Sequence, residues 1–392
     1  MSSRLAKPIA GIALALGLVA LALRYCPVPW SAVLFVLSMV LVPFIWCTRS
    51  DWTRVAMISI AAACLAIAAF EGYLGFQRPG PDGMREEQQS IMGYIHEDGV
   101  LGYALNGSIR VHSRRYFKQE LIYDVIYTIN SDGLRIVPPT REGQHKGCVV
   151  FLGDSFTFGD GVNDDETFPY QVGLKTEGQY SIYNFAMSGY GAHQMLALLQ
   201  SGRIDRVLRC SPTQFVYWAI PSHVERTAGL VPWDRHGPRF ELDANGNAVL
   251  AGHYDDPPHL LGVTLPRWID FSLEHSFIWQ RSFGTWRAVV PSDVELFVAV
   301  VAAAARVIKE RYPSSTFSVI LWDAELREEA RVALLAEKLH ADGVRVLRET
   351  AAIPDLRTNF FRYALSPHDF HPNALQDELL ANYIVQHVLN QP

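Results

Sequence analysis

The chain has 392 residues, of which 49% are hydrophobic and 19% charged, so it is too apolar for a disordered protein and long enough for two domains. Its formal net charge of −6 argues against a nucleic-acid-binding protein, since such proteins usually carry a basic face. Its five cysteines are too few and too scattered for a disulfide-rich scaffold or a zinc ribbon.

Three apolar stretches precede residue 78 and predict three transmembrane helices, at about residues 8–24, 30–47 and 55–76. One such stretch can be a buried helix of a soluble protein, but three in succession indicate a membrane anchor over residues 1–78. The first stretch also has the length of the apolar region of a cleaved signal peptide, and this alternative leaves two spans.

The distribution of Lys and Arg predicts the orientation of this anchor. Arg4 and Lys7 precede the first stretch, and Arg49 and Arg54 lie between the second and the third, whereas only Arg24 lies between the first and the second. By the positive-inside rule, the N-terminus is then cytoplasmic and the rest of the chain lies outside. We therefore expect a multi-pass protein of the bacterial cytoplasmic (inner) membrane, with its body facing the periplasm or the cell exterior.

Residues 79–145 are interpreted as a linker followed by a small β module. The segment Gln77–Gly83 is rich in Pro and Gly and cannot continue a helix. Two runs, 99–105 and 121–129, are of β type, and the second alternates between apolar and polar residues before the turn signal Asn130–Gly133.

From residue 146 to 392, strand and helix patterns alternate, which predicts an α/β domain with a doubly wound, flavodoxin-like parallel sheet. The expected strands are 148–152, 182–185, 214–220, 317–322 and 344–347, and the expected helices are 168–176, 193–201, 293–311 and 324–341. An insertion at about 222–291 interrupts this alternation, with a hairpin signal at 240–250 that contains an Asn-Gly turn. The insertion is either a wall or lid over a substrate or an additional packing subdomain.

Ser155 is the candidate nucleophile. It follows the first strand of the sheet, and Gly153 and Gly159 on either side permit a tight turn that would expose its hydroxyl. Serine needs a neighbouring base to become a nucleophile. The alternative is that Ser155 caps the following helix, although Asn163 or Asp164 would cap the helix at 168–176 more naturally.

The candidate base is His371, which lies in the segment His368–Asn373 just before the last helix. A loop at this position can reach the carboxyl end of the first strand, and Asp369 would orient the imidazole and stabilise its charged form. Taken alone, this segment is equally compatible with half of a metal site or a solvated loop. The histidines of 253–259 form a second metal-like cluster, but no Cys or Glu accompanies them.

Three sequence blocks resemble those of the SGNH (GDSL) family of esterases and acyltransferases, in the same order and at the same positions in the fold. They are Gly153–Ser155 after the first strand, Asn184–Gly189 after the second and Asp369–Asn373 before the last helix. The resemblance covers about residues 146–392. In addition, Tyr127–Arg135 resembles the short segment that precedes this domain in membrane-attached bacterial members.

The resemblance implies a triad of Ser155, His371 and Asp369, with the backbone N–H groups of Ser155 and Gly189 as oxyanion donors. It implies neither a cofactor nor a metal. Asp154 is expected to brace the loop as a hydrogen-bond acceptor rather than to take part in the chemistry.

The third block departs from the family pattern, which normally supplies a side-chain Asn as a further oxyanion donor. The segment Ala219–Arg226 contains no Asn. Ser222 or His223 could replace it, or the site could work with fewer donors. A packed structural role is the alternative for His223.

Cys148 and Cys210 each begin a predicted strand, and these two strands are neighbours in the usual order of this fold. A disulfide between them is one alternative if the body is extracytoplasmic. Two buried free thiols are the favoured expectation.

The leading functional interpretation is a membrane-anchored serine esterase that removes O-acyl groups, in particular acetyl groups, from an extracytoplasmic glycan through an acyl-Ser155 intermediate. An O-acyltransferase on surface polysaccharide, supplied by a membrane-bound acyl donor partner, would use the same triad. A non-catalytic glycan-binding protein on this scaffold is the third alternative. Dinucleotide binding is excluded, because Gly159-Asp-Gly161 and Gly189-Tyr-Gly191 lack the third glycine of that motif.

Overall fold

The computed structural model of the chain describes residues 30–76, 83–89, 93–141, 146–231, 233–256, 259–260, 263–264 and 289–389. The chain divides into two units, one formed by residues 1–80 with 256–288 and the other by residues 81–255 with 289–392.

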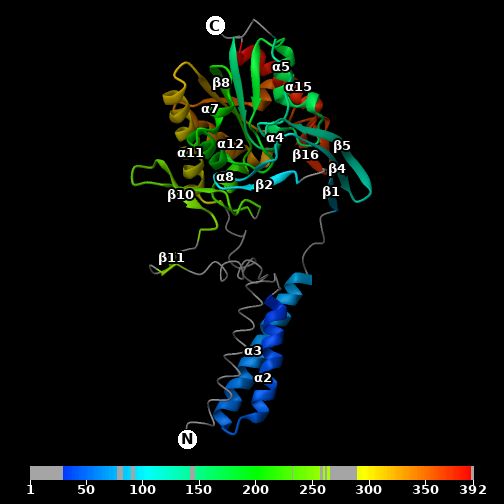
Figure 1. Cartoon of the computed structure of the whole chain (residues 1–392), viewed down its shortest axis with the longest axis vertical. Coiled ribbons are helices and arrows are strands. Elements are labelled where there is room, and N and C mark those ends of the chain that lie inside the picture. Colours follow the sequence, from blue (N-terminus) through cyan, green and yellow to red (C-terminus); the bar gives the residue numbers. More distant parts are fainter. Residues whose placement is uncertain are drawn as a thin grey trace. The chain divides into compact units, whose positions relative to one another are not determined.

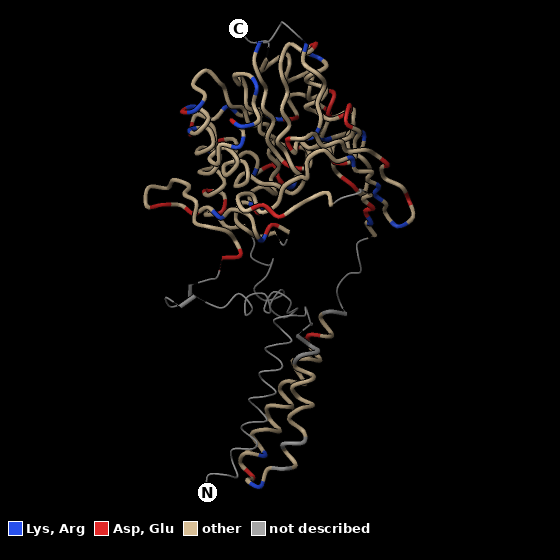
Figure 2. The backbone as a smooth tube through the Cα atoms, in the orientation of Figure 1, with Lys and Arg blue, Asp and Glu red and all other residues tan. Residues whose placement is uncertain are grey.

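The first unit contains a helical hairpin of α2 (Trp30–Cys47) and α3 (Asp51–Phe76). In the turn between them, the Arg54 guanidinium donates to the Thr48 carbonyl at 2.8 Å. Figure 2 shows few charged residues along these helices away from that turn. By length and composition alone, the segment Asp51–Leu74 is long and apolar enough to cross a membrane. The first predicted span lies outside the described residues, and three spans are not confirmed.

The second unit is built on a five-stranded sheet in which all neighbouring strands run parallel. Its strands are β6 (Gly147–Leu152), β7 (Tyr180–Asn184), β8 (Pro212–Ala219), β13 (Thr316–Leu321) and β14 (Arg345–Arg348). The spatial order is β14-β13-β8-β6-β7, which is the flavodoxin-like order expected from the sequence. The chain reverses its direction of winding between β6 and β8, and ligand sites of such sheets form at the carboxyl ends of the strands at this point.

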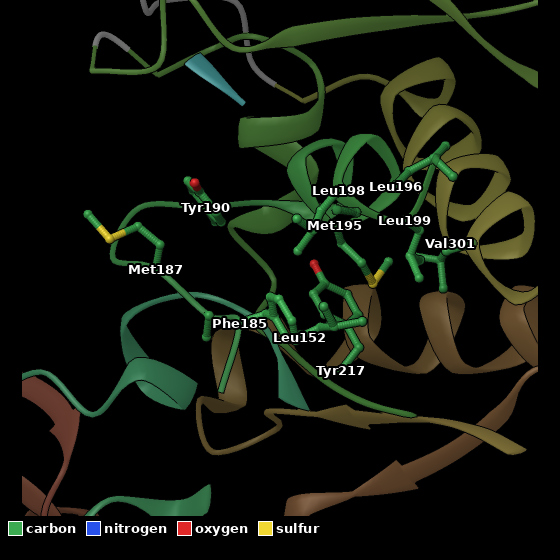
Figure 3. Close-up of a cluster of buried hydrophobic side chains, with 14 of the residues drawn as sticks. Leu152, Phe185, Met187, Tyr190, Met195, Leu196, Leu198, Leu199, Tyr217 and Val301 are labelled. Carbon is green, nitrogen blue, oxygen red and sulfur yellow. The ribbon is translucent and has the colours of Figure 1, made fainter. Parts of the chain in front are cut away.

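Helices cover both faces of the sheet, because the side chains of each strand alternate between two apolar cores. Helices α5 (Phe168–Lys175) and α15 (Ala374–Ile384) cover one core, and α6 (Ala192–Gln200), α11 (Pro291–Arg311) and α12 (Glu329–Ala341) cover the second. Val149 and Phe151 pack into the first core, whereas Val150 and Leu152 pack into the second. Figure 1 shows helices on both sides of the sheet, and Figure 3 shows part of the second core, where Leu152 lies beside Tyr217 of the neighbouring strand β8.

These elements agree with the predicted ones to within two residues, except that α12 begins later than expected. The sequence predicts a helix from residue 324, but a 3-10 turn (Leu326–Glu328) precedes α12. The reason lies at the end of β13, where Asp323 accepts hydrogen bonds from the Thr350 backbone and hydroxyl and from Arg357. These long-range contacts fix the residue just before the predicted start of the helix, and the α-helix begins only after the 3-10 turn.

Shorter elements complete this unit. They are α4 (Ser155–Phe158), a 3-10 turn (Asp164–Glu166), α7 (Arg203–Val207), α8 (His223–Thr227), β9 (Pro238–Leu242), β10 (Ala248–His253), α13 (Glu349–Ala352), α14 (Phe360–Tyr363), β15 (Ala364–Ser366), β16 (Asp369–Pro372) and a π turn (Val385–Leu389). Strands β9 and β10 form the hairpin predicted inside the insertion. The short pair β11 (His259–Leu260) and β12 (Val263–Thr264) lies in the part of the insertion that belongs to the first unit, and residues 265–288 are not among those that the structure describes.

The segment before the parallel sheet forms β structure, as predicted. It comprises a hairpin of β2 (Ile95–Asp98) and β3 (Gly102–Leu105) and an antiparallel sheet of β1 (Met84–Gln89), β4 (Ile109–Phe117) and β5 (Glu120–Ile129), in the order β1-β4-β5. Strand β1 was not predicted, because its charged residues do not alternate with apolar ones. Its place comes from pairing with β4.

Arg135 connects this antiparallel sheet to the loop that carries Ser155. Its guanidinium is fully buried and donates to the carbonyls of Phe158, Gly159 and Val162 at 2.5–3.0 Å. The cation also lies over the ring of Tyr127, at 4.4 Å from the ring centre. The Tyr127–Arg135 segment thus supports the backbone that follows the nucleophile.

Cys148 and Cys210 form a disulfide, with 5.9 Å between their Cα atoms. The expectation of two free thiols is therefore wrong. The neighbouring strands β6 and β8 bring the two positions together, and the Cys148 backbone N–H donates to the Ser211 carbonyl. The sequence could indicate the neighbouring strands, but not this close approach of two thiols.

Candidate active site

Ser155 begins the short helix α4, directly after β6. A Cβ on Gly153 would lie 2.2 Å from the Thr157 hydroxyl oxygen, so only glycine fits where the turn is tightest. Gly159 ends α4 in the left-handed conformation.

Asp154, rather than Ser155, caps helix α4, because its carboxylate accepts a hydrogen bond from the Phe156 N–H at 3.1 Å. The helix at 168–176 is capped by Thr167 and not by Asn163 or Asp164.

The structure brings together the three side chains of the expected triad. His371 Nε2 lies 2.9 Å from Ser155 Oγ, and His371 Nδ1 lies 2.6 Å from Asp369 Oδ1. Asp369 also accepts the His371 backbone N–H at 3.2 Å, so the same carboxylate fixes both the ring and its backbone. Strand β16 carries both residues to the carboxyl end of β6, and Ser155 is only 6% exposed.

The charges around His371 favour its protonated form. Burial of the imidazole disfavours that form, but the hydrogen bond and charge of Asp369, together with the charge of Asp160, outweigh this effect and raise the pKa of His371. Burial likewise disfavours the charged form of Asp369, but His371 and Arg115 hold the pKa of this carboxyl well below its usual range. Asp369 is therefore ionised at neutral pH and can stabilise an imidazolium.

Asp154 braces the loop, as expected. Its side chain is fully buried and accepts a hydrogen bond from Arg226 at 2.8 Å, and the same Arg226 nitrogen donates to the Tyr190 carbonyl at 2.7 Å. Burial opposes ionisation, but the charges of His223 and Arg226 hold the pKa of Asp154 well below its usual range.

His223 occupies the same buried cluster and does not fit the expected donor role. Its Nε2 lies 3.1 Å from Asp154 Oδ2, and its Nδ1 lies 2.6 Å from the Tyr217 hydroxyl. Both ring nitrogens face protein groups, and the side chain is fully buried. The packed structural alternative therefore describes His223 better. Ser222 is half-buried and precedes α8.

The second sequence block lies beside the nucleophile. Asn184 donates to the Thr157 carbonyl at 3.1 Å and so connects the end of β7 to α4. Farther along, Ser188 donates to Asp160 at 2.8 Å, and the Asp160 N–H donates to the Ser155 carbonyl. These contacts hold the backbone of Gly189 close to the loop of Ser155. Gly189 has a φ of +83°, which favours glycine.

Two charged residues near the triad, Asp160 and Arg115, were missed by the sequence reasoning. Asp160 follows α4, and burial raises its pKa to about 6 although the charge of His371 favours its ionised form. Arg115, from β4, donates to Asp369 Oδ2 at 2.8 Å. The position of Asp160, five residues after the nucleophile, was a weak indication in the sequence that it lies near the site. Nothing in the sequence indicated the contact of Arg115 with Asp369, which are 254 positions apart.

The insertion contributes an exposed tryptophan beside Gly189. Trp233 is 54% exposed, its indole N–H donates to the Gly189 carbonyl at 3.3 Å, and Arg226 lies under its ring. Its neighbour Asp234 is buried and lies 2.5 Å from His193 Nε2 in α6. The insertion is thus anchored on both sides of the exposed indole.

Among the residues that the structure describes, no group of three or more His, Cys, Asp or Glu side chains is arranged to hold a metal ion. His253 Nδ1 donates to the His236 carbonyl at 2.8 Å, and His368 stacks on Phe117.

No protein-family model matches the chain, and no curated protein matches it in sequence. Solved structures that resemble it include a lipolytic protein of the G-D-S-L family from Desulfitobacterium hafniense, with 13% identity, a TM-score of 0.36 and coverage of 61% of this chain and 97% of that one. An acetylxylan esterase from Geobacillus stearothermophilus has 13% identity, a TM-score of 0.34 and coverage of 63% and 95%. A carbohydrate esterase described as having divergent catalytic and non-catalytic binding functions has 13% identity, a TM-score of 0.39 and coverage of 79% and 98%.

Proposed function

We propose that the protein is a serine esterase of SGNH type that acts through an acyl-Ser155 intermediate. The observation that carries this proposal is the continuous hydrogen-bonded chain from Ser155 Oγ through His371 to Asp369, with distances of 2.9 and 2.6 Å. A nucleophile, a base and a carboxylate in this order are the parts that acyl transfer requires.

The reaction starts when Ser155 Oγ attacks the ester carbonyl carbon while His371 Nε2 takes the hydroxyl proton. Asp369 stabilises the imidazolium that forms. The backbone N–H groups of Ser155 and Gly189 stabilise the oxyanion, and each such donor lowers the barrier by about 3 kcal/mol. His371 then gives the proton to the leaving alcohol oxygen, the C–O bond breaks, and acyl-Ser155 remains. Water attacks the acyl group in the same way and releases the acid.

A glycan that carries O-acyl groups, with acetyl as the first candidate, is the substrate that the surroundings of Gly189 support. The exposed Trp233 is fixed by the Gly189 carbonyl and by Arg226, so its ring is preorganised. The negative face of an aromatic ring attracts the partly positive C–H groups of a sugar ring. We place the esterase outside the cytoplasmic membrane, anchored through the N-terminal apolar segments, of which Asp51–Leu74 is long and apolar enough to span.

The test compares the full chain with Ser155→Ala, both in detergent, on p-nitrophenyl acetate and on an O-acetylated glycan. We expect acetate release by the unmodified protein and at least a 10³-fold lower rate for Ser155→Ala, because the nucleophile is lost. Equal rates for the two proteins would refute the esterase. Transfer of acetyl to an added glycan in excess of hydrolysis would instead identify an acyltransferase.

A further inference from the structure

The triad carboxylate is held by an arginine from outside the parallel sheet. Asp369 uses Oδ1 for His371, and its other oxygen, Oδ2, accepts a hydrogen bond from Arg115 at 2.8 Å. Arg115 belongs to β4 of the antiparallel sheet, and Figure 1 shows β16 beside β4 and β5. The Asp369 side chain is only 3% exposed, so little water competes for this ion pair.

Arg115 is itself oriented by its neighbours in the antiparallel sheet. Glu86 of β1 is its direct cross-strand partner, and the Glu86 carboxylate lies 3.5 Å from the second terminal nitrogen of the guanidinium. Glu86 is fixed in turn by the hydroxyl groups of Tyr123 and Ser113, at 3.1 and 3.2 Å. The guanidinium therefore bridges Glu86 and Asp369 with its two terminal nitrogens.

The strand pairing next to Arg115 is irregular. The pairing of β4 with β5 shifts between Arg115 and Tyr116, where β5 carries one additional residue. Such bulges redirect side chains and are frequent next to active sites.

We propose that Arg115 is a positioning residue of the triad, whose guanidinium holds the Asp369 carboxylate in the orientation that aligns His371 with Ser155. The catalytic site is then completed by the β1-β4-β5 sheet and not by the parallel sheet and its helices alone. This inference rests on the proposed esterase function, and it goes beyond it by giving the preceding β module a part in catalysis.

The charge of Arg115 also acts on His371. The charged groups that act on the imidazole are Asp369 from β16, Asp160 from the loop after α4, and Arg115 from β4. The two carboxylates favour the imidazolium and the guanidinium disfavours it. Loss of the Arg115 charge therefore raises the pKa of His371, so that a higher pH is needed to obtain the neutral base.

The experiment measures kcat and KM from pH 4 to 9 with p-nitrophenyl acetate for the full chain in detergent. Arg115→Gln is expected to lower kcat about 10- to 100-fold, because misplacement of a catalytic group by about 1 Å costs this much. KM should stay within about twofold, since Arg115 is not placed against the substrate, and the acidic limb of the kcat/KM profile should move to higher pH. Arg115→Lys keeps the positive charge but loses the forked guanidinium that reaches both carboxylates. The acidic limb of its kcat/KM profile should therefore stay at the pH of the unmodified protein, whereas its kcat should be recovered only in part.

The matched control is Arg114→Gln, which removes the neighbouring, more exposed arginine that pairs with Asp124. All variants are compared at equal amounts of folded protein, as judged by thermal melts. A folded Arg115→Gln protein with the kcat and pH profile of the unmodified chain would overturn the proposal. An Arg115→Lys protein with unreduced kcat would also overturn it. If the Arg115→Gln protein does not fold, the Arg115→Lys protein alone decides. Absence of Ser155-dependent turnover in the unmodified protein would instead overturn the proposed function.

Discussion

At the scale of single residues, three charged groups act on the pKa of the His371 imidazole. Asp369 orients His371 and stabilises its charge, Arg115 reduces that effect, and Asp160, in the loop after α4, adds a second negative charge. Asp160 accepts a hydrogen bond from Ser188, which precedes Gly189. A change of its charge therefore reaches both the base and the segment that supplies the proposed oxyanion donor.

The Asp160→Asn variant tests this electrostatic account. His371 must be neutral to accept the Ser155 proton, so kcat/KM falls as the pH drops below the pKa of His371. The Asp160 carboxylate raises that pKa, and an amide in its place would remove the charge while its oxygen still accepts from Ser188. We therefore expect the acidic limb of the kcat/KM profile to move to lower pH.

The control is Asp124→Asn, which removes an ion pair at the surface of β5. Its profile should coincide with that of the unmodified protein. An acidic limb that stays in place or moves to higher pH in Asp160→Asn would show that Asp160 does not act on His371 through its charge.

At the scale of elements, the parallel sheet and its helices follow directly from the sequence. Continuous apolar runs such as Cys148–Leu152 are typical of strands buried on both faces, and the structure confirms each of the five strands. Ser155, His371 and Asp369 were candidates from their positions after the first strand and before the last helix, and the resemblance of three short blocks supported the same triad. What the sequence could not show are contacts that depend on long-range pairing, such as β1 on β4, Arg115 on Asp369 and the enclosure of His223 by Asp154 and Tyr217.

The insertion offers a prediction at this scale, because its described part holds Trp233 beside Gly189. Trp233→Ala should lower kcat/KM on an O-acetylated glycan about tenfold, equivalent to about 1.4 kcal/mol of binding energy, because the sugar loses its stacking surface. On p-nitrophenyl acetate, which has no sugar, the rate should stay within about twofold. Trp233→Phe keeps the aromatic face and should recover most of the loss.

Leu250→Ala provides the control, since Leu250 is an exposed apolar side chain of the same insertion. Its rates should match those of the unmodified protein on both substrates. If Trp233→Ala reduces both rates equally, the indole supports the backbone of Gly189 and does not bind the sugar.

At the scale of the whole molecule, the disulfide links the fold to its compartment. Disulfides persist in oxidising environments such as the periplasm and are rare in the cytosol. The Cys148–Cys210 bond therefore agrees with the proposed location outside the cytoplasmic membrane. The bond closes a loop with a sequence separation of 62, which in the chain-entropy treatment corresponds to about 4 kcal/mol of stability.

Alkylation of the purified chain, followed by mass spectrometry of its peptides, tests this bond. Cys148 and Cys210 should stay unmodified until a reductant is added, whereas Cys64, a free thiol, serves as the internal control under denaturing conditions. The double variant with serine at both positions should unfold at a lower temperature because its unfolded chain is less constrained. Alkylation of both residues without reductant would contradict the pairing.

The central claim, that Ser155 is a nucleophile activated by His371, is tested most directly by covalent labelling of the full chain with a fluorophosphonate. The account predicts one adduct, located on Ser155 by mass spectrometry of the peptides, absent from Ser155→Ala and formed at least 10²-fold more slowly in His371→Ala. A folded chain that carries no adduct on Ser155, or that is labelled equally fast after His371→Ala, would contradict it.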